Sequence, residues 1–230
     1  MIFAVVPAKR LDLAKGRLSP PFSPGFRRGL AKAMLHDVLA ALRSCSNVSR
    51  IILVTSDPEL EVIGHGHGAV SCSVDADAGY SAAAAAGCKE AERLGGEQAL
   101  IVPGDLPRLD ARSLDRLAGL ARITDKALVV PSRDGQGTNA LLVRPATWRQ
   151  FCFGPESYRR HLACAAEAGI EIATADEPRI ALDIDQPCDL RDLQGYPASG
   201  VTGEFLGASM EFCAFLERQA ASAEQGELCR

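Results

Sequence analysis

The sequence predicts a single α/β domain with a mostly parallel, partly mixed sheet that helices cover on both faces. Apolar runs of strand length recur along the chain, at residues 2–6, 51–55, 99–102, 127–130, 139–143 and 179–182. Segments with helical periodicity lie between several of these runs. Strands this apolar cannot face water on either side, so we expect a three-layer arrangement.

The spacing of apolar residues predicts the helices between these runs. A helix is expected over residues 27–42, because apolar side chains recur there at a period of about 3.6 residues. An alanine-rich helix over residues 81–94 ends at a Gly-Gly pair, which is a helix-stop signal. Two further helices are predicted over residues 114–121 and 158–168.

The alternation of strands and helices breaks between the runs at 127–130 and 139–143. The segment PSRDGQGT that separates them is too short for a crossover helix. The two strands therefore either pair antiparallel or diverge through a loop. Gly135 and Gly137 suit a turn at this point.

The pattern weakens after Leu193. Residues 194–207 are rich in Gly, Pro and small side chains, which indicates a linker, and residues 209–220 predict a short helix. We therefore expect a catalytic domain over residues 1–193, followed by a linker and a short helical or disordered tail over residues 194–230.

Composition narrows the classes of protein that fit the chain. Its 230 residues are 47% apolar and 23% charged, which is ordinary for a soluble domain. No apolar run approaches a membrane span, and the first run lacks the form of a signal peptide, so we expect a cytoplasmic protein without a membrane partner. The eight cysteines form no C-x-x-C pair and no zinc-spaced cluster, so we interpret them as reduced packing residues.

A basic loop follows the first predicted strand and leads into the first predicted helix. Up to Lys32 the chain has seven Lys or Arg residues and one acid, Asp12, although its net charge is −4. A strand that leads into a basic loop and a helix is a common phosphate site in α/β proteins. A local positive field in an acidic chain favours a small anionic ligand over nucleic acid. The candidate phosphate contacts are Lys9, Lys15 and Arg17.

Three aspartates follow other apolar runs. Asp105 comes directly after the run at 99–102, and Asp183 and Asp185 project to one side of an extended segment. Ligands of open α/β sheets bind beyond the carboxyl ends of strands, so these carboxylates are candidate ligands of Mg²⁺. The alternative is that they form turns or helix caps. The chain lacks the glycine signatures of P-loop and dinucleotide-binding proteins, and it lacks a nucleophile elbow.

Small polar residues supply a candidate anion site. Thr138 enters a predicted strand, and Gly154 and Ser157 precede the predicted helix at 158–168. Unpaired amides at the start of a helix bind anions, and Ser157 is either a helix cap or a ligand. His161 lies one turn beyond Ser157, and a structural role is the simpler interpretation. The histidines of the GHGHG segment are interpreted as part of a turn rather than a metal clip.

Several spaced motifs together resemble one known family. The segments VPAK, AKGRLS, MLHDVL, TSDPE, PGDLP, GTNALLVRP, FGPESYRRH and LDIDQPCDL occur in this order. The same order is found in the 2-phospho-L-lactate guanylyltransferase family, which includes phosphoenolpyruvate and 3-phospho-D-glycerate guanylyltransferases. The resemblance covers about residues 1–193 and implies a fold like that of nucleotide-diphospho-sugar transferases.

The resemblance implies an activity. Members of this family move GMP from GTP onto a phosphorylated three-carbon acid and release diphosphate, in the biosynthesis of coenzyme F420. It implies GTP and the acid as partners and Mg²⁺ as the cofactor. It also implies hand-over of the product to a downstream transferase, and a homodimer is compatible with it. Two alternatives stay open: a nucleotidyltransferase that uses another base or acceptor, and a non-catalytic nucleotide-binding protein.

The resemblance also implies roles for individual residues. The acceptor phosphate is held through Mg²⁺ by the aspartates, and the acceptor carboxylate by the polar residues; by motif these are Asp105, Asp183 and Asp185, and Thr138, Gly154 and Ser157. The basic side chains of Lys9, Lys15 and Arg17 would act in catalysis by holding the triphosphate. The family's usual Gly-Leu-Asn is Gly79-Tyr80-Ser81 here, so Gly79 and Ser81 stand at the expected nucleoside contacts, and guanine preference is less certain.

Overall fold

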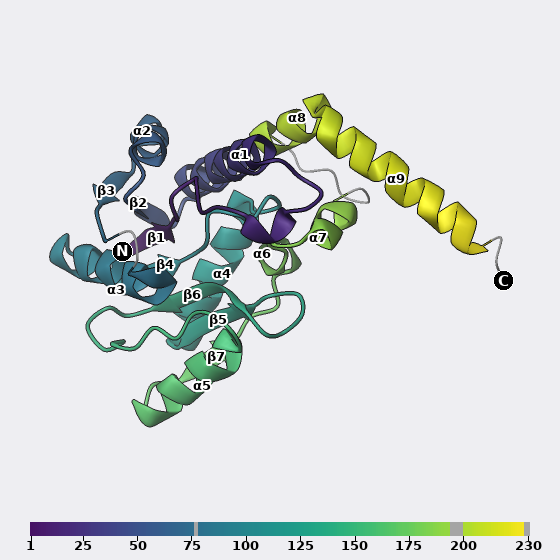
Figure 1. Cartoon of the computed structure of the whole chain (residues 1–230). Helices are drawn as coiled ribbons and strands as arrows, with labels where there is room; N and C mark the ends of the chain where they lie inside the picture. The colour runs from purple at the N-terminus through teal and green to yellow at the C-terminus, as the bar shows by residue number, and fades with distance from the viewer. Residues whose placement is uncertain (76–77, 194–199, 228–230) are drawn as a thin grey trace.

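A seven-stranded sheet forms the middle layer of the computed structural model, which describes residues 1–75, 78–193 and 200–227 (Figure 1). The strand order is β3-β2-β1-β4-β6-β5-β7. Among the strands of the described residues, only β6 runs antiparallel to its neighbours, β4 and β5. The strand bounds are β1 Ile2–Pro7, β2 Val48–Val54, β3 Val70–Cys72, β4 Gln98–Ile101, β5 Ala127–Pro131, β6 Thr138–Val143 and β7 Ile172–Thr174.

Helices cover both faces of this sheet, as the apolar runs predict. Alternate residues of β1 enter two different apolar clusters, with Ala4 in one and Val5 in the other. The first cluster contains side chains of α1 (Pro24–Ser44), α2 (Pro58–Gly66) and α4 (Ala111–Thr124). The second contains side chains of α3 (Gly79–Arg93) and α5 (Ser157–Glu167). The three-layer prediction is therefore confirmed.

A third apolar cluster joins the outer side of α1 to the C-terminal helices. Leu30 and Met34 of α1 pack there with residues of α7 (Pro187–Asp192), α8 (Gly200–Ala208) and α9 (Met210–Glu227). Asp37 of α1 accepts hydrogen bonds from the amides of Val201 (2.9 Å) and Thr202 (2.8 Å) at the start of α8. From α8, α9 extends away from the sheet (Figure 1).

The described residues include only part of the predicted linker at 194–207. Residues 194–199 lie outside the described residues, whereas residues 200–207 belong to α8, so the linker prediction is wrong for them. The short helix predicted at 209–220 is confirmed within α9. Small residues indicated a linker because they lack helix signals, but here Asp37 and the apolar face of α1 stabilise the helix. The division of the chain at residue 193 stays a prediction.

Several predicted elements differ from the structure. The apolar run at 179–182 is not a strand, because Pro178 begins the short helix α6 (Pro178–Ala181). The predicted turn that contains the GHGHG histidines holds only in part, because Asp57 caps α2 and the helix continues through His65 to Gly66. The strands at 127–130 and 139–143 pair antiparallel, which was one of the two alternatives. No helix in the described ranges is long and apolar enough to cross a membrane.

Candidate active site

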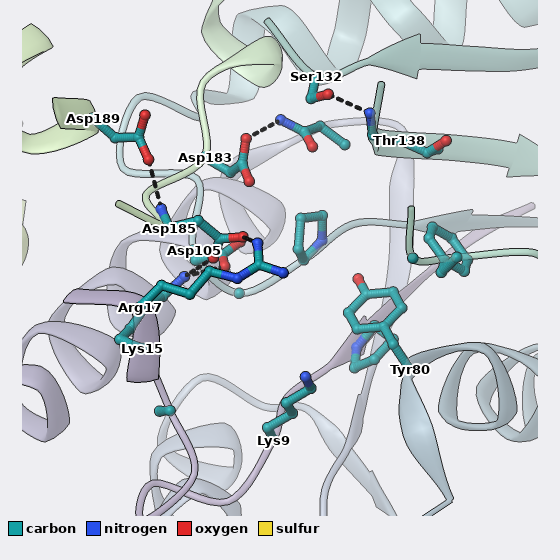
Figure 2. Close-up of a pocket in the computed structure, with 18 of the residues that line it drawn as sticks. Lys9, Lys15, Arg17, Tyr80, Asp105, Ser132, Thr138, Asp183, Asp185 and Asp189 are labelled. Carbon is teal, nitrogen blue, oxygen red and sulfur yellow. Dashed lines mark hydrogen bonds and ion pairs between the residues drawn. The ribbon is translucent and has the colours of Figure 1, made fainter. Parts of the chain in front are cut away.

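The residues singled out above gather at one edge of the sheet. The parallel strands β1 and β4 end there, and the antiparallel strand β6 begins there, so Asp105 and Thr138 reach the same edge from opposite chain directions. A cleft of about 830 Å³ opens at this edge. It is lined by the loops after β1 and β4, the β5–β6 turn, the segment before α5 and the segment around Asp183 and Asp185 (Figure 2).

Asp183 and Asp185 are held in place by neighbouring side chains. The Asn139 amide donates to the Asp183 carboxylate (3.1 Å) and to the carbonyls of Ile180 (3.0 Å) and Ala181 (2.9 Å). Asp189 caps α7 by accepting from the amides of Asp185 (2.9 Å) and Gln186 (2.7 Å), which Figure 2 shows in part. Because Asp189 performs the capping, the alternative of Asp185 as a cap is wrong, and its carboxylate is available to the cleft.

Lys15 supplies positive charge between the aspartates. Its ammonium forms ion pairs with Asp105 and Asp185, the latter at 3.3 Å, and its side chain is only 7% exposed. Burial is the largest influence on the pKa of Lys15 and lowers it, but the two carboxylates outweigh burial and leave the pKa raised. Arg17 lies 3.3 Å from Asp185 and is 74% exposed, so it has freedom to move towards a ligand.

The aspartates carry more negative charge than these cations balance. Burial, followed by the charge of Asp105, raises the pKa of Asp183 to about 6. Asp105 Oδ1 is buried and has no hydrogen-bond partner. As the side chains stand, no three His, Cys, Asp or Glu residues of the described chain converge closely enough to hold a metal ion. Lys15 lies among the carboxylates instead, as Figure 2 shows.

Lys9 lines the same cleft from the loop after β1. Among the ion pairs of the described residues, none involves Lys9. It is exposed at the cleft, whereas Lys15 is already paired with carboxylates. The predicted cationic trio therefore reaches one cleft, with Lys9 the member that is free of acidic partners.

The predicted anion-binding residues also line the cleft. Thr138 and Ser157 are buried, and Gly154 adopts φ 113°, a conformation that favours glycine. The amide of Ser157 donates to the Gly154 carbonyl (3.1 Å) and that of Tyr158 to the Gln136 carbonyl (3.1 Å). The prediction of unpaired amides here is therefore wrong for these two groups, and stays a prediction for the other amides of the segment. Ser157 begins α5 and Glu156 is the N-cap, so the cap alternative for Ser157 is wrong.

Gly79 and Ser81 are not among the residues described as lining the cleft. The Ser81 hydroxyl accepts a hydrogen bond from the amide of Phe153 (3.0 Å), so it holds the segment before α5. The predicted contact of Gly79 and Ser81 with the nucleoside stays a prediction. Their neighbour Tyr80 does line the cleft, and its hydroxyl oxygen is buried without a partner.

Tyr80 is the residue that the sequence reasoning missed. Its ring contacts that of Phe153 edge-on, with centroids 4.7 Å apart. Burial, then the charges of Asp105 and Asp183, raise its pKa well above the ordinary value, so the hydroxyl stays neutral and keeps its proton. The signal in the sequence was that Tyr80 stands at the Leu position of the family's Gly-Leu-Asn, which adds a hydroxyl there.

Solved structures with a similar fold are known. A putative nucleotide-diphospho-sugar transferase from Desulfovibrio desulfuricans G20 matches with a TM-score of 0.69 and 15% identity, covering 97% of each chain. A nucleotidyl transferase from Methanothermobacter matches with a TM-score of 0.59 and 22% identity, covering 91% of this chain and 99% of the other. The fold is that of the nucleotide-diphospho-sugar transferases, which confirms the predicted fold class.

Sequence relatives narrow this class to a family. The family described as "Guanylyl transferase CofC like" matches residues 2–222, and the chain belongs to it. A phosphoenolpyruvate guanylyltransferase from Conexibacter woesei is 41% identical over 198 residues, 86% of this chain and 89% of that protein. A 3-phospho-D-glycerate guanylyltransferase from Phenylobacterium zucineum is 35% identical over 196 residues, 84% of this chain and 89% of that protein. The protein is therefore a nucleotidyltransferase, and the resemblance in its motifs is confirmed.

Proposed function

We propose that the protein transfers the guanylyl group of GTP to the phosphate of a phosphorylated three-carbon acid, as a step in coenzyme F420 biosynthesis. The observation that carries this proposal is the composition of the cleft. It is lined by the paired cation and carboxylates of Lys15, Asp105 and Asp185 and also by the uncharged donors Thr138 and Ser157. A ligand that bears both phosphates and a smaller anion matches this lining.

The chemistry requires positioning more than proton transfer. The second pKa of a phosphate monoester is about 6, so the acceptor phosphate is already ionised at neutral pH and needs no general base. One of its oxygens attacks the α-phosphorus of GTP, a new P–O–P bond forms, and the bond to the leaving diphosphate breaks. Lys15 and Arg17, with Lys9, would neutralise the phosphates and stabilise the charge that accumulates on the diphosphate.

We infer that Mg²⁺ is the cofactor and that Asp105, Asp183 and Asp185 hold it. Carboxylate oxygens are the ligands this ion prefers, and the buried, unpartnered Oδ1 of Asp105 fits such a role. When bound, the ion would neutralise the phosphates. A cation among the carboxylates would also release the Lys15 ammonium towards the triphosphate, because it would take over the charge balance that Lys15 provides in this structure.

The acceptor is proposed as a class. The relatives named above act on phosphoenolpyruvate and 3-phospho-D-glycerate, and 2-phospho-L-lactate is the third candidate. All three carry a carboxylate and a phosphate, so Thr138, Gly154 and Ser157 would hold the shared carboxylate. Differences of a few atoms among them are worth only a few kcal/mol of discrimination.

Diphosphate release tests the proposal. The protein is incubated with Mg²⁺, with GTP, ATP or CTP, and with each of the three acids in turn. We expect release only when one of the acids is present and fastest with GTP. Release with a sugar phosphate but with none of the three acids would favour the alternative acceptor. Asp183→Asn serves as the inactive control.

Two further expectations belong to the proposal. In the product, GMP is joined to the phosphate of the acid through a P–O–P bond and is an activated leaving group. The product is therefore suited to hand-over to a downstream transferase. The homodimer stays a prediction, which light scattering coupled to size-exclusion chromatography checks.

A further inference from the structure

His161 does not line the cleft itself, but it lies behind the residues Thr138 and Gly154, which do. Its imidazole is completely buried between the start of β6 and the segment before α5. The Cys152 amide lies 3.1 Å from Nε2, and Thr138 Oγ1 lies 3.0 Å from Nδ1. The ring therefore joins the two segments that carry Thr138 and Gly154.

The Cys152 contact fixes which ring nitrogen bears the hydrogen. A backbone amide can only donate, so Nε2 must accept and cannot carry a hydrogen. A neutral imidazole then carries its hydrogen on Nδ1. Burial, then the neighbouring Arg160, lower the pKa of His161 to about 4, which is consistent with a neutral ring at physiological pH.

The hydrogen on Nδ1 determines what Thr138 can do. Nδ1–H then faces Thr138 Oγ1 at 3.0 Å and donates to it, with the Ser157 backbone as a further contact of the ring, so the hydroxyl cannot direct its own hydrogen at the ring. The hydrogen bonds within the described residues give Thr138 Oγ1 no other partner. Since Thr138 lines the cleft, its hydroxyl hydrogen is left for a ligand there.

We propose that His161 is a positioning residue that makes the Thr138 hydroxyl a donor to the carboxylate of the acceptor acid. The same ring holds the segment before α5 through the Cys152 amide and an edge-on contact with Phe153, whose ring centroid lies 4.7 Å away. The identity of the ligand rests on the proposed function, whereas the direction of the hydroxyl hydrogen does not.

Steady-state kinetics test the positioning role, with the acid that gives the fastest diphosphate release as the varied substrate. We expect His161→Leu to raise the KM for the acid about 10- to 100-fold, because the Thr138 hydroxyl is no longer held as a donor to a charged group, while the KM for GTP changes less than about twofold. Asn places an amide donor near the position of Nδ1, so His161→Asn should recover most of the affinity for the acid.

A double-mutant cycle separates this role from simple packing. Thr138→Val removes the hydroxyl itself, so adding His161→Leu to it should raise the KM for the acid little further. If the two effects multiply instead, or if His161→Leu weakens GTP and the acid equally, the proposal is wrong. His161→Asn with Thr138→Val provides the same cycle if His161→Leu does not fold.

The tautomer can be measured without any activity. In ¹⁵N-labelled protein, the four histidines give separate ring-nitrogen signals, and His161→Asn assigns the relevant one. We expect a protonated Nδ1 and an unprotonated Nε2 at pH 7. An Nε2–H tautomer overturns the inference even if the enzyme is active. If none of the three acids supports turnover, the proposed function fails while this measurement still decides the inference.

Discussion

Lys15 occupies the position that the proposed metal ion would influence most. Its ammonium balances Asp105 and Asp185, so removing it leaves carboxylates that repel one another. We predict that Lys15→Gln lowers the melting temperature in EDTA, and that Mg²⁺ raises the melting temperature of Lys15→Gln more than that of wild type. The physical reason is that Lys15 competes with the cation for the same negative charge.

A surface pair offers the matched control for this prediction. Lys126 pairs with Glu171 at 3.1 Å, away from the cleft. Lys126→Gln should therefore show the same response to Mg²⁺ as wild type. Equal Mg²⁺ shifts for Lys15→Gln and wild type would contradict a cation site beside Lys15.

Tyr80 places an unpartnered hydroxyl in the cleft, and its removal should separate stability from function. An unsatisfied buried polar group costs about 1–3 kcal/mol, so Tyr80→Phe should make the unliganded protein more stable in denaturant titrations. It should also slow turnover, because a ligand is the natural partner for this donor. Tyr158→Phe is the control, since that hydroxyl lies at the surface and contacts Thr174 at 2.8 Å. A Tyr80→Phe enzyme with unchanged kinetics would remove the hydroxyl from the site.

His161 predicts a pH dependence of stability. Its pKa is about 4 in the folded protein and 6.5 in the unfolded chain, so the unfolded state binds more protons between these values. The contribution is therefore complete above pH 6.5 and is lost as the pH falls towards 4. It amounts to about 3 kcal/mol, at 1.36 kcal/mol for each pKa unit.

Unfolding at pH 7 and pH 4.5 checks this contribution. We expect the free energy of unfolding to fall less between these two pH values in His161→Asn than in wild type. His65→Asn, at an exposed position, should leave the difference as it is in wild type. An identical loss in His161→Asn and wild type would mean that the buried ring is not the titrating group.

At the scale of elements, the contact between α1 and α8 depends on the absence of a side chain. A Cβ at Gly29 would lie 2.5 Å from the Phe205 ring, whereas a Cβ at Gly119 of α4 would meet nothing within 4 Å. Overpacking costs about 1–3 kcal/mol, and replacing a helical glycine that has free space around it with alanine gains about 0.5–1 kcal/mol. We therefore predict that Gly29→Ala lowers the melting temperature and Gly119→Ala raises it. A higher melting temperature in both variants would contradict a tight contact between the Phe205 ring of α8 and Gly29 of α1.

The elements that the sequence predicted well are those that are buried in the middle of the fold. Three examples are the strands at 2–6 and 99–102 and the helix at 27–42. Apolar side chains cover each of them on both sides, and their apolar pattern reflects this burial directly. The sequence missed β3 and β7, which have three residues each and lie at the edges of the sheet. A run as short as 179–182 does not distinguish strand from helix by periodicity.

The residues of the site also divide into those that the sequence could predict and those that it could not. Asp105 and Thr138 could be predicted because strand ends in an α/β sheet meet at one edge. The tasks of Asn139 and Ser81 could not, because each depends on a partner that is distant in sequence. Family resemblance supplied positions for these residues but not their hydrogen-bond partners.

At the scale of the whole molecule, one cleft gathers basic side chains in a chain whose net charge is negative. The net charge is −4, yet Lys9, Lys15 and Arg17 reach the edge of the sheet where two phosphorylated substrates must meet. The carboxylates beside Lys15 and Arg17 would be balanced by a metal ion, and Thr138 and Ser157 would hold the acid. Function therefore depends on the fold bringing these segments to one edge.

The measurement that tests the central claim most directly follows the oxygens of the acceptor. The acid is supplied with ¹⁸O in all four oxygens of its phosphate, together with unlabelled GTP and Mg²⁺, and the products are weighed. The account predicts an adduct of GMP and the acid that retains all four labelled oxygens, together with unlabelled diphosphate. Free GMP without an adduct, or label in the diphosphate, would contradict it.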